Sequence, residues 1–325
     1  MRAAWYSSNG DARDVLVVGD MPDPNAGPGE VRVRLVTSGV NPSDVKSRRA
    51  RPLTDERIVP HSDGAGVIDQ IGAGVSASRL GERVWTWNAQ WQRALGTAAE
   101  FVVLPSAQAV YLPEGTDFAA GACLGIPALT AVQAVRLCGE VAGKTALVTG
   151  AASAVGHYVA QILTQAGARV LGTAGSDEKA QHAQTAGVHE VIDYKTEQVV
   201  ERVKALTGGQ GVGLIVDMDF SLTSTWLPAG VLAPHGTLVG YGSNQAAEMP
   251  INFRSLLWNS LTLKFFLVYD LLPADRQAAL QQLAGLLHAR QLQHSLGSQF
   301  GLADIAAAHE AVEAGREIGN VVLTL

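Results

Sequence analysis

The chain has 325 residues, which is enough for two domains of ordinary size, each with a buried core. Hydrophobic residues make up 47% of the sequence and charged residues 17%, and this balance excludes general disorder. The formal net charge of −6 gives no broad attraction to nucleic acids or anionic membranes, so nucleic-acid binding is not expected.

The sequence shows no feature of a membrane or secretory protein. No apolar run approaches the roughly 20 residues that span a bilayer, and the first ten residues lack the apolar core of a signal peptide. The two cysteines, Cys123 and Cys138, do not form a Cys-x-x-Cys pair. A disulfide framework is therefore not expected, and we predict a cytoplasmic protein without a membrane partner.

Residues 1–110 are predicted to be rich in β-strands. Apolar and charged residues alternate between Val31 and Val36, which is typical of a half-buried strand. Glycine and proline cluster over 23–29, and glycine pairs near residues 65 and 73 bracket another short strand. We therefore expect short strands joined by tight turns in this part of the chain.

Residues 120–265 follow a different pattern, in which strands and helices alternate. This alternation predicts a parallel sheet that is covered by helices on both faces. After it, a helix is predicted near 273–289 and another at 302–315. The predicted strands are 145–149, 169–173, 190–193, 213–217 and 236–240 in the parallel sheet, then 295–300 and 320–325.

The most informative segment runs from Lys144 to Gly167, where a short apolar strand leads through small residues into a helix. Such a turn directs free backbone N–H groups and the positive end of the helix dipole toward one point, which suits a diphosphate. Ser153 and Ala154 replace glycines of the usual Gly-x-Gly-x-x-Gly fingerprint. We predict a dinucleotide site, with a structural strand-turn-helix that binds nothing as the alternative.

The end of the next strand indicates which dinucleotide is bound. In dinucleotide folds a carboxylate at this place binds the ribose hydroxyls of NAD and repels the extra phosphate of NADP. The strand 169–173 has no acid at its tip, whereas Ser176 can donate to a phosphate and Lys179 can supply positive charge. Tyr194, after the third strand, is placed to close the site. We predict NADPH, with a solvated helix lysine as the alternative reading of Lys179.

Seven short motifs occur along nearly the whole chain: Asn41-Pro42, Pro60–Val67, Gly81–Val84, Leu124–Ala131, Leu171–Gly175, Gly297–Phe300 and Ala308–Glu310. In sequence and order they resemble those of the zeta-crystallin-like quinone oxidoreductases, in the medium-chain dehydrogenase/reductase superfamily. The resemblance implies an α/β protein with a GroES-like, β-rich catalytic domain of residues 1–120 and 266–325. It also implies a Rossmann domain, a doubly wound parallel sheet that binds the nucleotide, of residues 121–265.

The resemblance also implies an activity and a set of site residues. Members of this family transfer hydride or electrons from NADPH to quinones, and relatives reduce activated alkenes. Substrate would lie in a cleft between the domains, with Asn41 facing the reacting centre. The cofactor-binding positions would be Thr130, Ser153, Ala154, Val155, Gly156, Ser176, Lys179, Tyr194, Gly242, Ser243, Asn244, Phe266, Leu267, Val268 and Asn320.

No metal is expected. Zinc dehydrogenases of the superfamily hold the metal with cysteine and histidine, but the first cysteine ligand is lost within Ser38–Pro42 and Ser62 stands at the histidine position. Without a Lewis acid the oxidation of an alcohol is disfavoured, whereas an electron-poor quinone or enone supplies the electron demand itself. His61 is either a titrating group near the cleft or a structural residue, and His309 is expected to be packed.

The substrate pocket is predicted from aromatic residues. Trp85, Trp87 and Trp91 are close in sequence, and flat rings can form the wall of a pocket for a planar quinone. Trp87 and Trp91 fall in a loop and are the stronger candidates, while packing in the β-rich core or in a subunit contact is the alternative. Lys46 is a further pocket candidate, because it stands where zeta-crystallin has an aromatic residue on the substrate side.

The predicted function is metal-free, NADPH-dependent reduction of quinones, in which Asn41 orients the substrate or the nicotinamide carboxamide. One alternative is an NADPH-dependent reductase of enone or alkenal double bonds. Another is an NADPH-binding sensor or structural protein with little turnover. The resemblance further implies a homodimer or homotetramer, formed through edge strands of the nucleotide domain.

Overall fold

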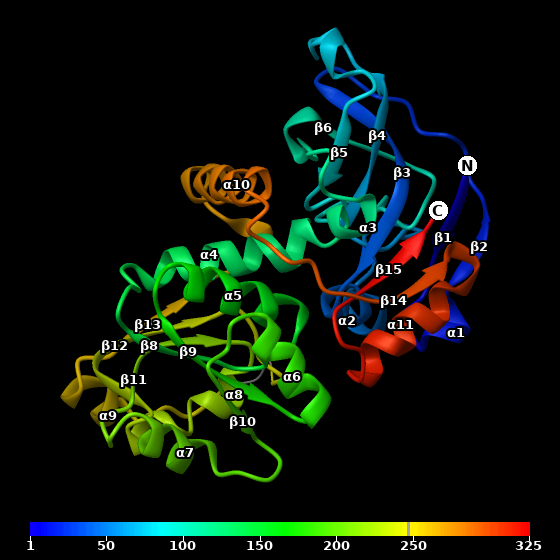
Figure 1. The fold of residues 1–325 in the computed structure, drawn as a ribbon. Helices are drawn as coiled ribbons and strands as arrows, with labels where there is room; N and C mark the ends of the chain where they lie inside the picture. Colours follow the sequence, from blue (N-terminus) through cyan, green and yellow to red (C-terminus); the bar gives the residue numbers. More distant parts are fainter. Residues whose placement is uncertain (246–247) are drawn as a thin grey trace. The chain divides into compact units, whose positions relative to one another are not determined.

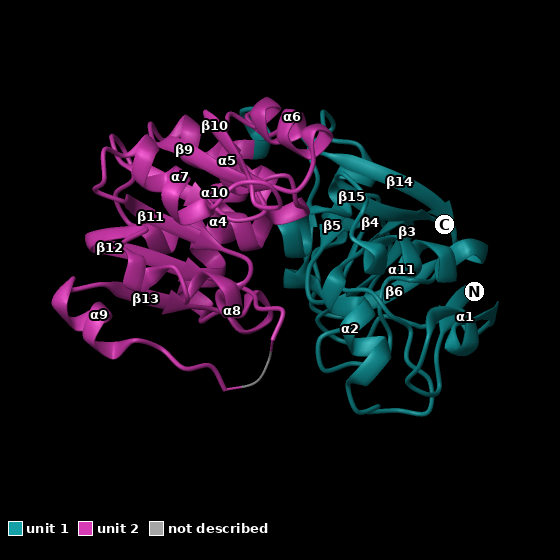
Figure 2. Ribbon diagram, turned by 90° about the horizontal axis from the view of Figure 1, so that it is seen from below, with its two compact units in different colours: residues 1–127, 287–290, 294–325 teal, residues 128–286, 291–293 magenta. Residues whose placement is uncertain are grey.

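The computed structural model describes residues 1–245 and 248–325, which form two compact units (Figures 1 and 2). Unit 1 consists of residues 1–127, 287–290 and 294–325, and unit 2 of residues 128–286 and 291–293. No described helix combines the length and apolar character that crossing a bilayer requires.

Unit 1 contains a seven-stranded, mostly antiparallel sheet and a two-stranded ribbon. Its strands are β1 (Arg2–Trp5), β2 (Val17–Asp20), β3 (Glu30–Val40), β4 (Asp63–Ile71), β5 (Arg83–Thr86), β6 (Phe101–Pro105), β7 (Ala109–Tyr111), β14 (Leu296–Gly301) and β15 (Asn320–Thr324). Its helices and short 3₁₀ turns are α1 (Ala12–Val15), α2 (Pro42–Ala50), α3 (Phe118–Gly121), α11 (Ile305–Ala314), η1 (Ala77–Arg79), η2 (Ser106–Gln108) and η6 (Leu302–Asp304).

Strand β3 is central to the sheet of unit 1, because it pairs with β15, β4 and β6. The strand order is β14-β15-β3-β4-β5-β7, and β6 pairs with β3 outside this order. Val31, Val33 and Leu35 are buried at alternate positions, which confirms the predicted half-buried strand. These side chains pack with Ile68 and Val84 in one apolar core. Because β15 comes from the far end of the sequence, both ends of the chain contribute to one sheet.

Unit 2 contains a six-stranded parallel sheet of order β10-β9-β8-β11-β12-β13. Its strands are β8 (Thr145–Val148), β9 (Arg169–Ala174), β10 (Glu190–Asp193), β11 (Val212–Asp217), β12 (Leu232–Gly240) and β13 (Thr262–Phe265). Its helices and short turns are α4 (Leu129–Cys138), α5 (Ala154–Gln165), α6 (Asp177–Thr185), α7 (Val199–Leu206), α8 (Phe220–Thr223), α9 (Phe253–Trp258), α10 (Pro273–His288), η4 (Leu227–Ala229) and η5 (Val268–Asp270).

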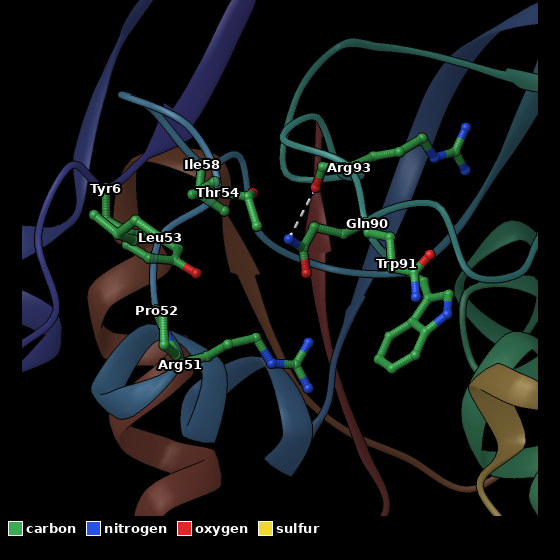
Figure 3. Close-up of a pocket in the computed structure, with 10 residues that line it drawn as sticks. Tyr6, Arg51, Pro52, Leu53, Thr54, Ile58, Gln90, Trp91 and Arg93 are labelled. Carbon is green, nitrogen blue, oxygen red and sulfur yellow. Dashed lines mark hydrogen bonds between the residues drawn. The ribbon is translucent and has the colours of Figure 1, made fainter.

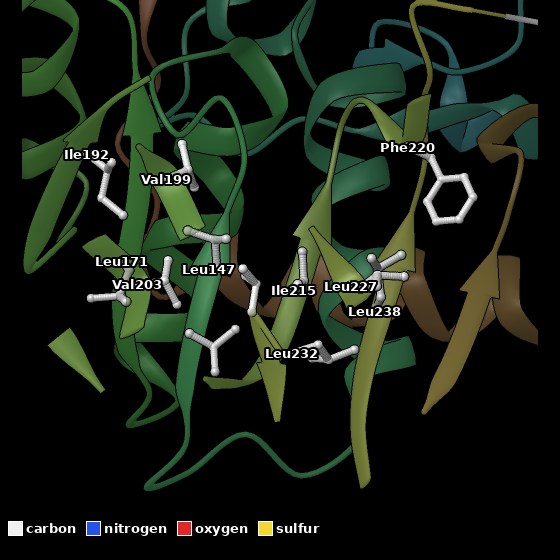
Figure 4. Close-up of a cluster of buried hydrophobic side chains, with 12 residues drawn as sticks. Leu147, Leu171, Ile192, Val199, Val203, Ile215, Phe220, Leu227, Leu232 and Leu238 are labelled. Atoms are coloured by element: carbon white, nitrogen blue, oxygen red, sulfur yellow. The ribbon is translucent and has the colours of Figure 1, made fainter. Parts of the chain in front are cut away.

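The predicted doubly wound sheet is confirmed, and all five of its predicted strands are present. Right-handed crossovers place α5 and α6 on one face of the sheet and α7 and α8 on the other. Figure 4 shows the core beneath the second face, where Leu147, Leu171 and Ile215 of the strands meet Val199 and Val203 of α7. The sixth strand, β13, was not predicted, because its four residues are short and largely exposed.

The boundaries of the two units differ from those of the predicted domains. The first division falls after Pro127 rather than after residue 120, inside the π-helical turn η3 (Leu124–Ala128). Residues 266–286, predicted to lie in the catalytic domain, belong to unit 2 because α10 is tied to it. Arg136 of α4 lies 4.0 Å from the Asp275 carboxylate of α10. The boundaries of the catalytic and nucleotide-binding domains themselves remain a prediction.

The order in which strands join the sheet reverses between β8 and β11, which are parallel neighbours in the sheet but are separated in sequence by β9 and β10. In open parallel sheets the carboxyl ends of strands at such a reversal border a crevice that receives ligands. The loops after β8, β9 and β11 are therefore the part of unit 2 in which a nucleotide site is expected.

Candidate cofactor and substrate sites

Side-chain hydrogen bonds hold the ends of three strands of unit 2 together. The Thr149 hydroxyl, at the end of β8, donates to the Asp217 carboxylate at 2.8 Å and accepts from the Met218 N–H at 2.8 Å. The Gly150 N–H donates to the Thr173 hydroxyl of β9 at 2.9 Å. These contacts fix the start of the turn that leads into α5, and sequence reasoning missed all of them because the partners are far apart in the chain.

The amino-terminal end of α5 has the form of an anion site. The Ser153 hydroxyl caps the helix by accepting from the Gly156 N–H at 3.1 Å. Within the described residues the first-turn N–H groups of Ala154 and Val155 have no acceptor, as expected for an exposed helix start. Glycine is required at 156, since a Cβ there would lie 2.2 Å from the Gly150 carbonyl oxygen. The turn therefore presents two N–H donors and the positive end of the helix dipole.

The structure brings Ser176, Lys179 and Tyr194 to the ends of β9 and β10. Ser176 caps α6 by accepting from the Lys179 N–H at 3.3 Å. The half-exposed Tyr194 ring lies against Gly175, where an added Cβ would be 2.5 Å from the tyrosine hydroxyl. The strand itself ends at Ala174 without a carboxylate. The Ser176 hydroxyl and the Tyr194 phenol thus lie at the ends of β9 and β10, where an adenosine phosphate is expected, and Lys179 lies in the first turn of α6.

The loop after β12 is held by a carboxylate that the sequence did not single out. Both the backbone N–H and the side-chain amide of Asn244 donate to Asp219, at 2.9 and 2.6 Å. Burial tends to raise the pKa of Asp219, but the hydrogen bonds from Asn244 and Ser221 outweigh it and keep the pKa below its usual value. Gly242 and Ser243 lie in the same loop, and Gly242 accepts from the Phe220 N–H at 3.2 Å. Asp219 is therefore the anchor of this segment.

The segment after β13 and a residue on α4 complete the predicted positions in unit 2. The Phe266 N–H donates to the Gly240 carbonyl at 3.4 Å, the Leu267 side chain is exposed, and Val268 is buried with its carbonyl bound to Arg276. The Thr130 hydroxyl of α4 is buried and has no hydrogen-bond partner among the described residues. Such a group usually binds a ligand or a water molecule.

In unit 1, Asn41 joins two buried carboxyl groups. Its backbone N–H donates to Asp44 at 2.7 Å and its side-chain amide donates to Asp63 at 2.9 Å. The same oxygen of Asp63 accepts from the Ile126 N–H at 3.0 Å, while its other oxygen has no partner within the described residues. Burial, reinforced by Asp44, raises the pKa of Asp63 well above its usual value. The amide of Asn41 is therefore held in one orientation.

Asn320, the other predicted cofactor residue of unit 1, lies at the start of β15 and is buried. Its side-chain amide donates to the Ser295 carbonyl at 2.8 Å, and its backbone N–H donates to the same oxygen at 2.9 Å. One hydrogen of the side-chain N–H₂ group therefore has a structural partner, which fixes the orientation of the amide.

The two histidines considered from the sequence form a buried pair. The His61 and His309 rings approach to 2.9 Å between their Nε2 atoms, and His61 Nδ1 lies 2.9 Å from the Ser38 hydroxyl. Burial lowers the pKa of His61 well below its usual value and that of His309 to about 3, so the pair is uncharged near neutral pH. Both are structural residues, as expected for His309. In the part of the chain that the structure describes, three or more His, Cys, Asp or Glu side chains nowhere gather as metal ligands.

The predicted pocket residues differ in burial. Trp85 is buried in β5, Trp87 is half-buried, and Lys46 is exposed on α2. Trp91 lines a cavity of about 250 Å³ in unit 1, whose lining includes neither Trp87 nor Lys46 (Figure 3). Sequence reasoning missed the other polar residues of this cavity, which are Tyr6, Arg51, Thr54, Gln90, Gln92 and Arg93.

Known families match both units. Residues 27–114 match the model of the alcohol dehydrogenase GroES-like domain, and residues 154–285 match that of the zinc-binding dehydrogenases. Together with the parallel sheet of unit 2, these matches define a dinucleotide-dependent dehydrogenase of the medium-chain class.

Comparison with individual relatives identifies the family. A quinone oxidoreductase from Pseudomonas aeruginosa is 31% identical over 95% of both chains. The structure of a mycobacterial protein complexed with NADPH has a TM-score of 0.88 at 27% identity, and that of an NAD-dependent alcohol dehydrogenase has a TM-score of 0.90 at 28% identity, each covering all of both chains. This chain belongs to the quinone oxidoreductase family of the medium-chain dehydrogenase/reductase superfamily.

Proposed function

We propose that this protein is an enzyme that reduces quinones with NADPH. The observation that carries the proposal is the likeness, over nearly its full length, to a quinone oxidoreductase. The geometry of unit 2 supports the choice of cofactor, because Ser176, Lys179 and Tyr194 meet beside a strand end without a carboxylate.

The donors of unit 2 fit a phosphorylated dinucleotide. The free N–H groups at the start of α5 suit the diphosphate, and the hydroxyl of Ser176 with the ammonium group of Lys179 suits the adenosine phosphate. The unpartnered hydroxyl of Thr130 suits a polar group of the nicotinamide end. We assign the cofactor to Thr130, Ser153, Ala154, Val155, Gly156, Ser176, Lys179, Tyr194, Gly242, Ser243, Asn244, Phe266, Leu267, Val268 and Asn320.

The contribution of the protein to the reaction is positioning. When bound, NADPH supplies a hydride to the acceptor. Asn41 orients the acceptor or the carboxamide, and it can do so because Asp63 and Asp44 fix its side chain and backbone from within the core. The site operates without a metal in this proposal, since a quinone is itself electron-poor.

Stopped-flow mixing of the NADPH-loaded protein with 1,4-benzoquinone tests the function. We expect oxidation of NADPH at a rate that rises with quinone concentration and saturates, and slower oxidation of NADH. Absence of nicotinamide oxidation at every quinone concentration would refute the proposal. Tight NADPH binding without oxidation would instead identify a sensor, and reduction of α,β-unsaturated ketones alone would identify a double-bond reductase.

We also propose that the protein is a homodimer or homotetramer that associates through β13. This strand forms one edge of the six-stranded sheet, and an unpaired edge can continue the sheet into a second copy. Phe253 and Trp258 of the neighbouring helix α9 and Phe265 of β13 are 68%, 72% and 56% exposed. Exposed apolar residues of this size at a sheet edge are typical of a protein interface.

The proposed compartment is the cytoplasm. Cys123 and Cys138 are both free and buried thiols, which a reducing compartment preserves. Burial raises the pKa of Cys138 to about 12 and that of Cys123 well above its usual value, so neither is a reactive thiolate.

A further inference from the structure

The cavity of unit 1 combines an aromatic face with a positive charge. The Arg51 guanidinium lies over the Trp91 ring, with its central carbon 5.4 Å from the ring centroid. Figure 3 shows the side chains of Tyr6 and Arg51 extending into the same hollow, with Gln90 and Trp91 on its other side. At about 250 Å³ the cavity is smaller than the roughly 300–1,000 Å³ of sites for drug-sized ligands, so it suits a molecule of one or two rings.

The charge of Arg51 is not neutralised by an ion pair. Its neighbours on α2, Arg48 and Arg49, both contact Glu313, whereas Arg51 has no carboxylate at ion-pair distance among the described residues. No aspartate or glutamate lines the cavity. The buried Asp44 interacts electrostatically with Arg51, but burial raises the pKa of Asp44 to about 7, so much of its negative charge is suppressed near neutral pH.

The second arginine of the lining does not supply charge to the cavity. The Arg93 guanidinium donates to the Asn88 carbonyl at 3.1 Å and to the Gln108 side chain at 2.8 Å, and Figure 3 shows it directed away from the hollow. The Arg93 backbone carbonyl accepts from the Gln90 amide at 3.1 Å. Arg51 is therefore the cationic group that a ligand in this cavity meets.

Tyr6 adds a neutral donor beside this cation. Its side chain is 3% exposed, and burial together with the Asp44 carboxyl raises its pKa to about 12, so the hydroxyl keeps its proton. A guanidinium and a hydroxyl donor placed beside an indole face match a planar ring that carries a carboxylate or sulfonate group.

We propose that this cavity binds the acceptor and selects planar conjugated molecules with an anionic substituent, which Arg51 and Tyr6 hold while the ring lies against Trp91. This inference rests on the proposed function for the identity of the acceptor as a conjugated carbonyl compound. It adds a preference for charge, and it makes Arg51 a residue that determines specificity.

Binding of a pair of non-reducible probes tests this preference. Calorimetric titration of the full-length protein compares 2-naphthoate with 2-naphthamide, which has the same rings and no charge. We expect naphthoate to bind about tenfold more tightly, as for one charge-assisted hydrogen bond. Arg51→Gln should remove this difference by weakening naphthoate about tenfold and leaving naphthamide within about twofold. Arg51→Lys, which keeps the charge, should retain most of the difference in affinity between naphthoate and naphthamide.

Arg57→Gln is the matched control. Arg57 also stacks on an indole, at 5.2 Å from the Trp5 ring, but it does not line the cavity, so this variant should keep the full preference. Equal affinities for the two probes in the unmodified protein, or an unchanged preference in Arg51→Gln, would overturn the inference. If Arg51→Gln lost both ligands, a preference maintained in Arg51→Lys would support the inference and its loss there would overturn it.

Turnover of neutral 1,4-naphthoquinone separates this inference from the proposed function. The unmodified protein should oxidise NADPH with this acceptor, and so should Arg57→Gln at a similar rate, because Arg57 does not line the cavity. Failure of the unmodified protein to do so refutes the function, whatever the naphthoate titrations show. Normal turnover without any charge preference refutes only the inference.

Discussion

The buried acids around Asn41 are the most unusual residues of unit 1. Asp44 and Asp63 are nearly inaccessible, yet neither has a cationic partner at ion-pair distance in the described structure. Burial favours their protonated forms, and hydrogen bonds from Asn41 are the main opposing influence. Because Asn41 donates to both carboxyl groups, the orientation of this proposed site residue is coupled to their protonation.

Asp44→Asn should change how stability depends on pH. The pKa of Asp44 is about 7 in the folded protein against an ordinary value of 3.8. Between these values the folded protein holds a proton that the unfolded chain has released, so this carboxyl makes stability fall as pH rises. Removing it should make the slope less negative by up to about 1.4 kcal/mol per pH unit between pH 4 and 7.

Urea unfolding at several pH values in this range measures the slope. Asparagine keeps an oxygen that accepts from the Asn41 N–H, so the fold should be retained. Asp55→Asn, at an exposed position after α2, is the control and should leave the slope unchanged. Identical slopes for Asp44→Asn and the unmodified protein would contradict the role given to Asp44.

Lys179→Ala should reduce the preference for NADPH over NADH. If the ammonium group contacts the adenosine phosphate, NADPH binding should weaken by about 1–3 kcal/mol while NADH binding changes little. Titration monitored by nicotinamide fluorescence measures both constants. Lys204→Ala, on α7 of the same unit, serves as the control, and equal losses for both cofactors would show that the assignment is incorrect.

At the scale of elements, the start of α5 determines whether unit 2 can hold a diphosphate. Ser153 stands at a position where glycine is common in such turns, and the structure shows what it provides: its hydroxyl caps the helix. Compared with glycine, the serine side chain keeps a diphosphate farther from the backbone, but its hydroxyl stabilises the start of α5.

Ser153→Ala should destabilise the protein by about 1 kcal/mol, because the Gly156 N–H loses its acceptor. Chemical denaturation measures this loss. Ser153→Thr keeps a capping hydroxyl and should retain most of the stability. A stability of Ser153→Ala equal to that of the unmodified protein would mean that the cap contributes nothing.

The elements of unit 2 could be predicted far better than its boundaries. Strands such as 190–193 are short apolar runs between helices, and local sequence is sufficient to identify them. The placement of residues 266–286 in unit 2 could not be predicted, because it depends on tertiary contacts such as that between Arg136 of α4 and Asp275 of α10. The cavity around Arg51 was missed for the same reason: Tyr6, Arg51 and Trp91 come from separate segments that only the tertiary fold brings together.

At the scale of the whole molecule, the structure bears on how copies of the protein associate and on the order in which its strands assemble. An apolar sheet edge with Trp258 and Phe265 beside it is expected to be covered in solution. This expectation connects one exposed strand to the oligomeric state of the protein.

Trp258→Glu should shift the protein from an oligomer to a monomer, because a carboxylate in an apolar interface loses its hydration without a partner. Sedimentation velocity measures the change. Leu80→Glu places the same charge on an exposed leucine of unit 1 and should leave the oligomer intact. An unmodified protein that sediments as a monomer would refute the proposed association.

The pairing of β15 with β3 has a consequence for biosynthesis. Residues 321–324 lie in register with residues 37–40, so almost the entire polypeptide separates two adjacent strands. During translation, which proceeds from the amino terminus, the parallel-sheet unit is released from the ribosome before this partner strand exists. Residues 37–40 of β3 therefore lack this partner until residues 321–324 emerge. Proteolytic trimming of those residues would remove the closing strand from a sheet that the rest of the chain cannot complete.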